Sequence, residues 1–143
     1  QNHEALNYLG YMFAEKGVRL AEAEAYVKRA LEAEPDNGAY LDSLGWVYYQ
    51  QAKYPEARKH LLEAVRVEEL RLTKERNERT RVAIHENLAI IHDHAGDVAR
   101  ALGLLDEARK HWSRAAHYNP DNSSVKKKLR EMDASTKESS QRP

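Results

Sequence analysis

Apolar side chains recur every three or four residues along most of this chain, which predicts amphipathic helices rather than strands. The pattern is clearest in residues 36–64, where two apolar stripes flank a polar turn near residues 52–53. The stripes consist of Leu41, Leu44, Trp46, Val47 and Tyr48, and of Ala57, Leu61, Leu62, Ala64 and Val65. Two such stripes joined by a tight turn predict a pair of antiparallel helices.

The same arrangement returns along the chain at matching offsets, which indicates an internal repeat. Glycines and alanines recur at steps of 34–35 and then 51 residues: Gly10, Gly45 and Gly96, and Ala23, Ala57 and Ala108. A glycine inside a helix fits where a partner helix approaches too closely for a larger side chain. We therefore expect three helix pairs, at residues 3–37, 38–71 and 89–122, with extra residues inserted after the second pair.

The inserted residues 72–88 lengthen two helices. Glu69 stands where a proline is expected to end the second pair, and no glycine or proline occurs from Arg66 to Leu88. The pattern predicts two long helices that meet at a break near residues 73–77 and project as a charged spur, residues 66–81. The alternative is a single fused helix across residues 55–101.

The C-terminal part continues the array and then loses its apolar positions. Val125, Leu129 and Met132 form one short apolar stripe, which predicts a capping helix at residues 123–134, with the lysines at 126–128 exposed. Residues 1–134 then form a single array, and the polar residues 135–143 are expected to be disordered. We expect the chain to be a fragment of a longer protein.

Composition narrows the function classes. Lys and Arg total 23, as do Asp and Glu, so the 143-residue chain has a formal net charge of zero. It therefore has no overall positive charge that would attract nucleic acid or an anionic membrane. There is no cysteine, which excludes disulfides and thiolate metal sites. No apolar run is long enough to span a membrane. A membrane span, a nucleic-acid partner and a cofactor are all unexpected.

The spacing Leu41-x2-Leu44-Gly45-x2-Tyr48, followed by Ala57-x3-Leu61-x2-Ala64, resembles the tetratricopeptide repeat. The segments LNYLGYMFAEKG, DNGAYLDSLGWVYY and IHDHAGDV resemble those of bacterial repeat proteins, many of which are envelope lipoproteins. This resemblance implies an all-α fold, a right-handed superhelix of helix pairs whose first helices line a concave groove. It implies binding of protein segments and no catalysis. The compartment stays open between the bacterial envelope or periplasm and the cytoplasm.

The resemblance also implies which side chains face the groove. Carried over to this sequence, the groove positions are Asn7, Tyr11 and Ala14, then Asp42, Trp46 and Tyr49, then Asp93, Asp97 and Arg100. Aromatic groups beside a few polar groups suit peptide binding. Three aspartates against one arginine favour a ligand with basic or amide donor groups. They disfavour the chaperone-tail type of groove, which clamps a C-terminal carboxylate with lysines and asparagines.

Plainer interpretations compete with these assignments. One alternative is that Trp46 and Tyr49 are covered by a neighbouring helix of the longer protein or pack on the spur. The aspartates are equally well explained as solvated surface. The histidines near residues 85–94 lack metal-ligand spacing, and the HENLA that starts at His85 lacks the second histidine of HExxH, so no metal site is expected. No nucleophile has a base at useful spacing, so we do not expect an enzyme.

The function expected from the sequence is a protein-interaction module that presents a concave groove to a peptide or a partner helix. An alternative of another class is a structural terminal segment of a longer solenoid, which serves intramolecular packing or self-association. A third hypothesis, RNA binding, depends on the five arginines of the spur alone.

Overall fold

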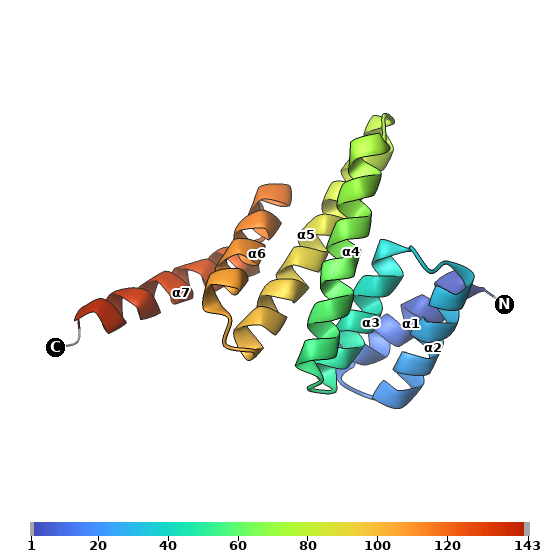
Figure 1. Ribbon diagram of the computed structural model, residues 1–143, viewed down its shortest axis with the longest axis horizontal. Helices are drawn as coiled ribbons and strands as arrows, with labels where there is room; N and C mark the ends of the chain where they lie inside the picture. Colours follow the sequence, from blue (N-terminus) through green and yellow to red (C-terminus); the bar gives the residue numbers. More distant parts are fainter. Residues whose placement is uncertain (1, 142–143) are drawn as a thin grey trace.

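The computed structural model describes the backbone of residues 2–141 and the side chains of residues 2–137, and shows an all-α array (Figure 1). The helices within that range are α1 (His3–Lys16), α2 (Leu20–Ala33), α3 (Gly38–Gln50), α4 (Tyr54–Lys74), α5 (Glu78–Ala101), α6 (Leu105–Tyr118) and α7 (Ser123–Gln141). The first six form the antiparallel pairs α1/α2, α3/α4 and α5/α6. The all-α fold with three helix pairs is confirmed, and α7 packs after the third pair.

The first helix of each pair, and α7, begins at a capping asparagine. Asn2, Asn37, Asn77 and Asn122 each accept a hydrogen bond from the backbone N–H three residues later, at 3.0–3.1 Å. Such a cap satisfies one of the backbone donors left free at a helix start. The second helices have no side-chain cap, because each starts directly after a tight turn.

The turns within the three pairs share one feature, although the first turn also has a second left-handed residue, Arg19, with a φ of 50°. The central residue of each turn, Gly17, Ala52 or Gly103, has a positive φ of 67°, 59° or 77°. In each case the N–H of the following residue donates to a carbonyl of the first helix, at 2.9–3.0 Å. Glycine adopts this left-handed geometry without strain, whereas the Cβ of Ala52 opposes it.

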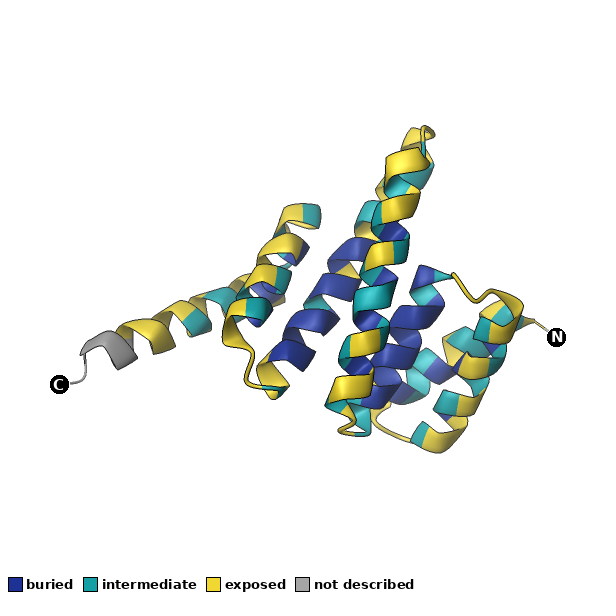
Figure 2. Ribbon diagram, viewed as in Figure 1, coloured by how far each residue is buried: buried dark blue, intermediate teal, exposed yellow. Residues whose placement is uncertain are grey.

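The two helices of a pair touch at the repeat markers. A Cβ built on Gly45 would lie 2.7 Å from the Leu61 side chain, and one on Gly10 would lie 2.5 Å from Val27. The marker alanines of the second helices are fully buried: Ala23, Ala57 and Ala108. Figure 2 shows buried residues concentrated on α3 and α5, the helices enclosed on both sides. Small residues at these points therefore set the close approach that defines the fold.

The spur consists of the ends of α4 and α5, which project together from the array (Figure 1). Residues 75–77 separate the two helices, within the predicted range, so the alternative of one fused helix is wrong. The Arg81 guanidinium closes the tip by donating to the carbonyls of Leu72 and Glu75, both at 2.9 Å. Within residues 2–141, no helix is both long and apolar enough to cross a membrane.

α7 is longer than predicted. It continues to Gln141, whereas the sequence predicts an end at residue 134 and disorder from 135 to 143; residues 142–143 lie outside the described range. The Arg109 side chain on α6 bonds Asp133 and, at 3.3 Å, Thr136. These contacts hold α7 against α6 beyond its apolar stripe, which the hydrophobic pattern alone does not reveal.

Candidate functional site

A groove lies along the first helices α1, α3 and α5, of which α3 packs against both α1 and α5. We call it the N-terminal groove. Its volume is about 360 Å³. Its lining residues are Glu4, Asn7, Tyr8, Tyr11, Ala39, Tyr40, Asp42, Ser43, Asn87, Ile90 and Ile91.

Large apolar side chains remain accessible in this groove. Tyr8 is 64% exposed and Ile90 is 48% exposed, although each lies on a helix that belongs to the array. Beside them, the Asn7 Oδ1 atom is buried and has no hydrogen-bond partner among the described residues. The groove therefore combines apolar surface with an unused acceptor, as peptide-binding grooves commonly do.

The structure brings together three of the predicted groove residues here, namely Asn7, Tyr11 and Asp42. Trp46 is not accessible, contrary to expectation. Its side chain is only 9% exposed, because its ring stacks between His94 at 4.0 Å and Tyr49 at 4.6 Å, measured between ring centroids. The cover comes from His94 on α5 of this chain, whereas the alternatives were a helix of the longer protein or the spur.

Asp42 is also buried, and its partner is His94. The Asp42 Oδ1 atom lies 2.8 Å from His94 Nδ1. Burial alone lowers the pKa of His94, but the charge and hydrogen bond of Asp42 outweigh it, so the pKa is raised. The His94 ring lies 6.1 Å from that of Tyr11, whose own pKa is raised by burial and by the Glu15 carboxylate. Asp42 thus anchors α5 to α3 instead of facing solvent.

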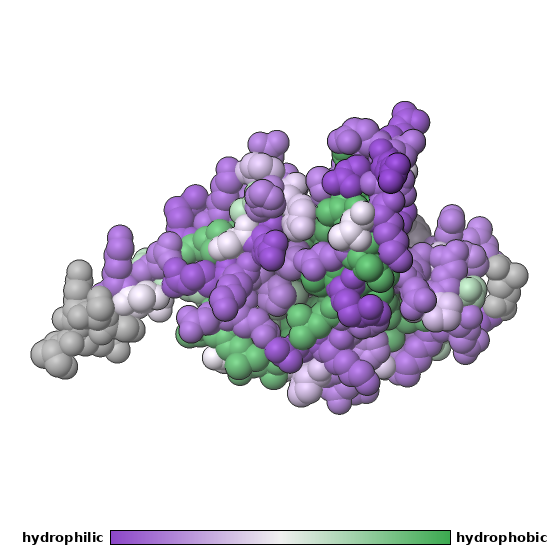
Figure 3. Space-filling model, turned by 45° about the horizontal axis from the view of Figure 1, so that its top comes forward, coloured by the Kyte–Doolittle hydropathy of each residue, from purple (hydrophilic) through white to green (hydrophobic). Residues whose placement is uncertain are grey.

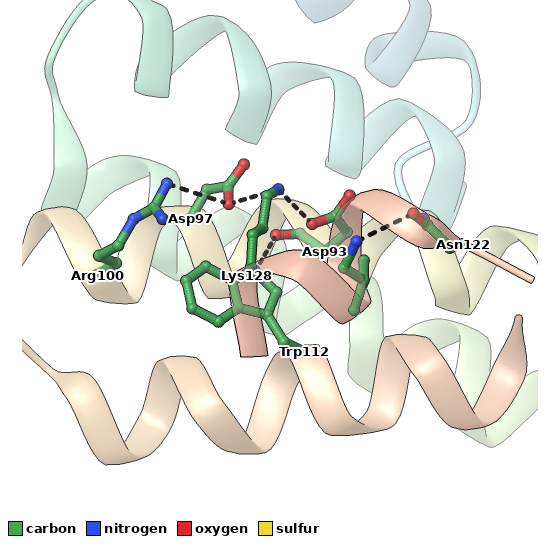
Figure 4. Close-up of polar contacts among 7 residues, drawn as sticks. Asp93, Asp97, Arg100, Trp112, Asn122 and Lys128 are labelled. Atoms are coloured by element: carbon green, nitrogen blue, oxygen red, sulfur yellow. Dashed lines mark hydrogen bonds and ion pairs between the residues drawn. The ribbon is translucent and has the colours of Figure 1, made fainter. Parts of the chain in front are cut away.

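Asp93 and Asp97 flank His94 in the sequence of α5, and both bind the Lys128 ammonium group of α7 (Figure 4). The Nζ atom is 2.8 Å from Asp93 Oδ1 and 2.9 Å from Asp97 Oδ1. Burial lowers the pKa of Lys128, yet the two carboxylates raise it overall. Lys128 is therefore only 19% exposed, which corrects the expectation that all three lysines at 126–128 face solvent.

Arg100, the last predicted groove residue, belongs to this second site. Its guanidinium lies 5.0 Å from the centre of the Trp112 ring and 3.8 Å from Asp97. A second groove of about 340 Å³ opens here between α5, α6 and α7. This C-terminal groove is lined by Arg100, Leu105, Asp106, Arg109, Trp112, Lys128, Glu131, Met132, Ser135 and Thr136.

The polar contacts between successive first helices follow the repeat. Asn7, Asp42 and Asp93 occupy equivalent positions, 35 and 51 residues apart. Their neighbours on the next helix are also equivalent: Ser43, His94 and Lys128. We call Asn7/Ser43, Asp42/His94 and Asp93/Lys128 the junction pairs. The second and third pairs are bonded, each at 2.8 Å.

The first junction pair is open. The Ser43 hydroxyl donates to the carbonyl of Ala39 at 3.0 Å, one turn earlier on its own helix. Asn7 consequently has no donor for its Oδ1 atom. The N-terminal groove lies at this junction, whereas the equivalent positions of the other two junctions are filled by His94 and by Lys128.

The histidines of α5 and α6 form a separate buried cluster. His92 Nδ1 lies 3.0 Å from His111 Nδ1, and Tyr118 stacks on His92. Burial, together with the nearby His111 and Arg114, lowers the pKa of His92 to about 4. Within the part of the chain that the structure describes, no group of three or more His, Cys, Asp or Glu residues is arranged to hold a metal ion.

The molecular surface is mainly hydrophilic. Figure 3 shows apolar patches over the middle of the molecule, bordered by polar side chains. Sequence reasoning missed the two most exposed apolar groups of the N-terminal groove, Tyr8 and Ile90. Tyr8 lies one residue off the predicted buried face of α1, and it occupies the repeat position of Ser43 and His94. This repeat position was the signal in the sequence that could have identified Tyr8 as a groove residue.

Comparison with protein families matches the tetratricopeptide repeat to residues 18–70 and 43–116, together more than half of the chain. The chain belongs to the tetratricopeptide repeat family. A TPR repeat-containing protein of Pseudomonas aeruginosa is 41% identical over 64 residues. That match spans 45% of this chain but only 11% of the length of this curated relative.

Solved tetratricopeptide domains share the fold. The first TPR of Spaghetti (RPAP3), bound to the HSP90 peptide SRMEEVD, has a TM-score of 0.74 at 20% identity, covering 95% of this chain and 96% of that one. The first TPR domain of human RPAP3 gives 0.73 at 19% identity, with 95% and 93% covered. The N-terminal domain of stress-induced protein-1 from C. elegans gives 0.67 at 21%, with 92% and 94% covered.

Proposed function

We propose that this tetratricopeptide array is a protein-interaction module that binds a peptide or a helix of a partner protein in the N-terminal groove. The observation that carries the proposal is the open first junction, where Tyr8 and Ile90 stay exposed beside the unpartnered Asn7 Oδ1 atom. Each of these groups gains by contact with a partner, because apolar area leaves water and a buried acceptor finds a donor.

A related domain gives independent support. The first TPR of Spaghetti is described with a bound peptide, and its fold spans nearly the same length as this chain. The likeness supports peptide binding as a mode of action, but it does not imply that this chain binds the same peptide. In this chain Tyr11 and Asp42 line the groove together with Asn7, while Trp46 stacks on His94 and Tyr49 stacks on Trp46.

The test is a pull-down that uses the 143-residue chain as bait, beside a Tyr8→Ala/Ile90→Ala variant. We expect a partner that is retained by the unmodified chain and lost from the variant. Val18→Ala is the matched control, because Val18 is 46% exposed but lies outside the groove, in the turn between α1 and α2. A partner retained by all three baits would place binding elsewhere.

A second candidate function, a structural segment that packs against further repeats or self-associates, is favoured by a specific observation on α1. Leu9 is 42% exposed, whereas its repeat equivalents Leu44 and Ala95 are buried on α3 and α5, helices that pack against the preceding pair. Light scattering at several concentrations tests it, since self-association raises the mass above that of the monomer. A Leu9→Arg variant would then return the mass to the monomer value.

We infer that the chain acts by binding, not by catalysis. Tetratricopeptide arrays are typically non-catalytic interaction modules. We also expect no nucleic-acid partner. Three of the five spur arginines already have partners: Arg66 pairs with Glu63, Arg71 with Glu68, and Arg81 with backbone carbonyls. Absence of a salt-sensitive RNA interaction is the expected result.

A further inference from the structure

The junction pairs show which chemistry the array uses to fill this position. At the second junction the acceptor on the earlier helix meets the imidazole of His94, and at the third it meets the ammonium of Lys128. Both donors are basic groups, and both are at most 19% exposed. At the first junction the acceptor, Asn7 Oδ1, is present and buried, but the basic group is missing.

The charges around the open junction are suited to a basic group. The charged residues that line the N-terminal groove are Glu4 and Asp42, both acidic. A neighbouring pocket, which shares Ala39 and Asn87 with the groove, adds the carboxylates of Glu34, Asp36 and Glu68. Arg71 is the single basic residue that lines either space. An approaching cation therefore meets a field of the opposite sign.

Glu68 in particular lacks close partners. It is 2% exposed, and its nearest polar contacts are Arg71 and Asn87, each at 3.5 Å. A buried carboxylate is costly unless it is well paired. A basic side chain that reached this pocket would improve the pairing, whereas an acidic one would be repelled.

We propose that the N-terminal groove selects a partner segment that carries a basic side chain beside a large apolar one. The basic group takes, at Asn7, the place that His94 and Lys128 take at the other junctions. The apolar side chain lies against Tyr8 and Ile90. This proposal rests on the proposed function, and it adds the chemistry of the partner.

Selection of random 12-residue peptides displayed on phage, with the 143-residue chain immobilised, tests this directly. Enriched peptides are expected to carry lysine or arginine within a few residues of an aromatic or aliphatic residue. They are then synthesised, and their affinities are measured by calorimetry for the chain and for two variants with opposite expectations. Asn7→Asp should tighten binding several-fold, and Asn7→Lys should weaken it by about tenfold or more.

Ser113→Lys is the matched control, because it adds the same charge at an exposed position of α6 outside the groove. Circular dichroism establishes that each variant is folded. Peptides that depend on Tyr8 but are acidic, or that ignore the charge at position 7, would overturn this inference and leave the proposed function intact. Failure to enrich any peptide whose binding is lost with Tyr8→Ala would overturn both.

Discussion

The first junction and the two that follow it are built from equivalent positions, yet they differ in what fills them. Asp42 and Asp93 each hold a basic group of the next helix, while Asn7 faces a serine that bonds its own backbone. Two differences separate the open junction from the closed ones: asparagine in place of aspartate, and serine in place of histidine or lysine. The comparison shows that the N-terminal groove lies at the junction whose internal contact is missing.

Breaking a closed junction should have the largest effect on stability. Asp42→Ala leaves the buried His94 without its acceptor. We expect the free energy of unfolding to fall by about 3 kcal/mol. Urea denaturation followed by circular dichroism measures it. Ser43→Ala at the open junction is the control, with an expected loss below about 1 kcal/mol. Equal losses would mean that the junctions do not differ.

The repeat itself was readable from the sequence, because glycines and small alanines mark where helices touch. The offsets that relate Gly10, Gly45 and Gly96 led to the correct helix pairs. The groove was predicted less well, since family positions identify a helix face but not what covers it. Trp46 has the right register for a groove wall, but its ring is covered by His94 of α5 on one side and by Tyr49 on the other.

Two histidines of α5 should make the free energy of unfolding depend on pH in opposite directions. His92 has its pKa lowered from 6.5 to about 4, so its contribution is present above pH 6.5 and is lost as the pH falls toward 4. The loss is on the order of 3 kcal/mol, at about 1.4 kcal/mol for each pKa unit. Unfolding of the chain and of His92→Gln between pH 4 and 8 should show it, with a flatter profile for the variant.

His94 should behave in the reverse sense. Its pKa is raised above 6.5 by Asp42, so its stabilisation is fully present below pH 6.5 and is lost as the pH rises through the raised pKa. Proton NMR titration of the two imidazoles distinguishes them. A His94 that titrates below His92 would contradict the assignment of Asp42 as its partner.

The third junction is less buried, and its loss should cost less. Lys128→Met removes the cation that Asp93 and Asp97 share, and we expect a loss of about 1.5 kcal/mol. Thermal unfolding measures it against Lys127→Met, which removes a lysine whose side chain is 71% exposed. Similar melting temperatures for both variants would show that Lys128 does not close the junction.

The smallest expected effect concerns the turns, where the second unit is the exception. Ala52 has a φ of 59° where the other units have glycine. Ala52→Gly should raise the free energy of unfolding by up to about 1 kcal/mol, because the Cβ strain is relieved. Ala83→Gly, in the interior of α5, should lower it by a similar amount. Destabilisation by both would refute the strain at Ala52.

The most direct test of the account closes the first junction by design. Asn7→Asp with Ser43→His copies the pair Asp42/His94 at the equivalent positions. Affinity for the peptides selected on the unmodified chain is measured by calorimetry for the double variant and for each single variant, with urea denaturation beside it. The account predicts that Asn7→Asp alone binds more tightly, and that the double variant stays folded and binds at least about tenfold more weakly. A folded double variant with unchanged affinity would contradict it, as would an Asn7→Asp variant that binds no better than the unmodified chain.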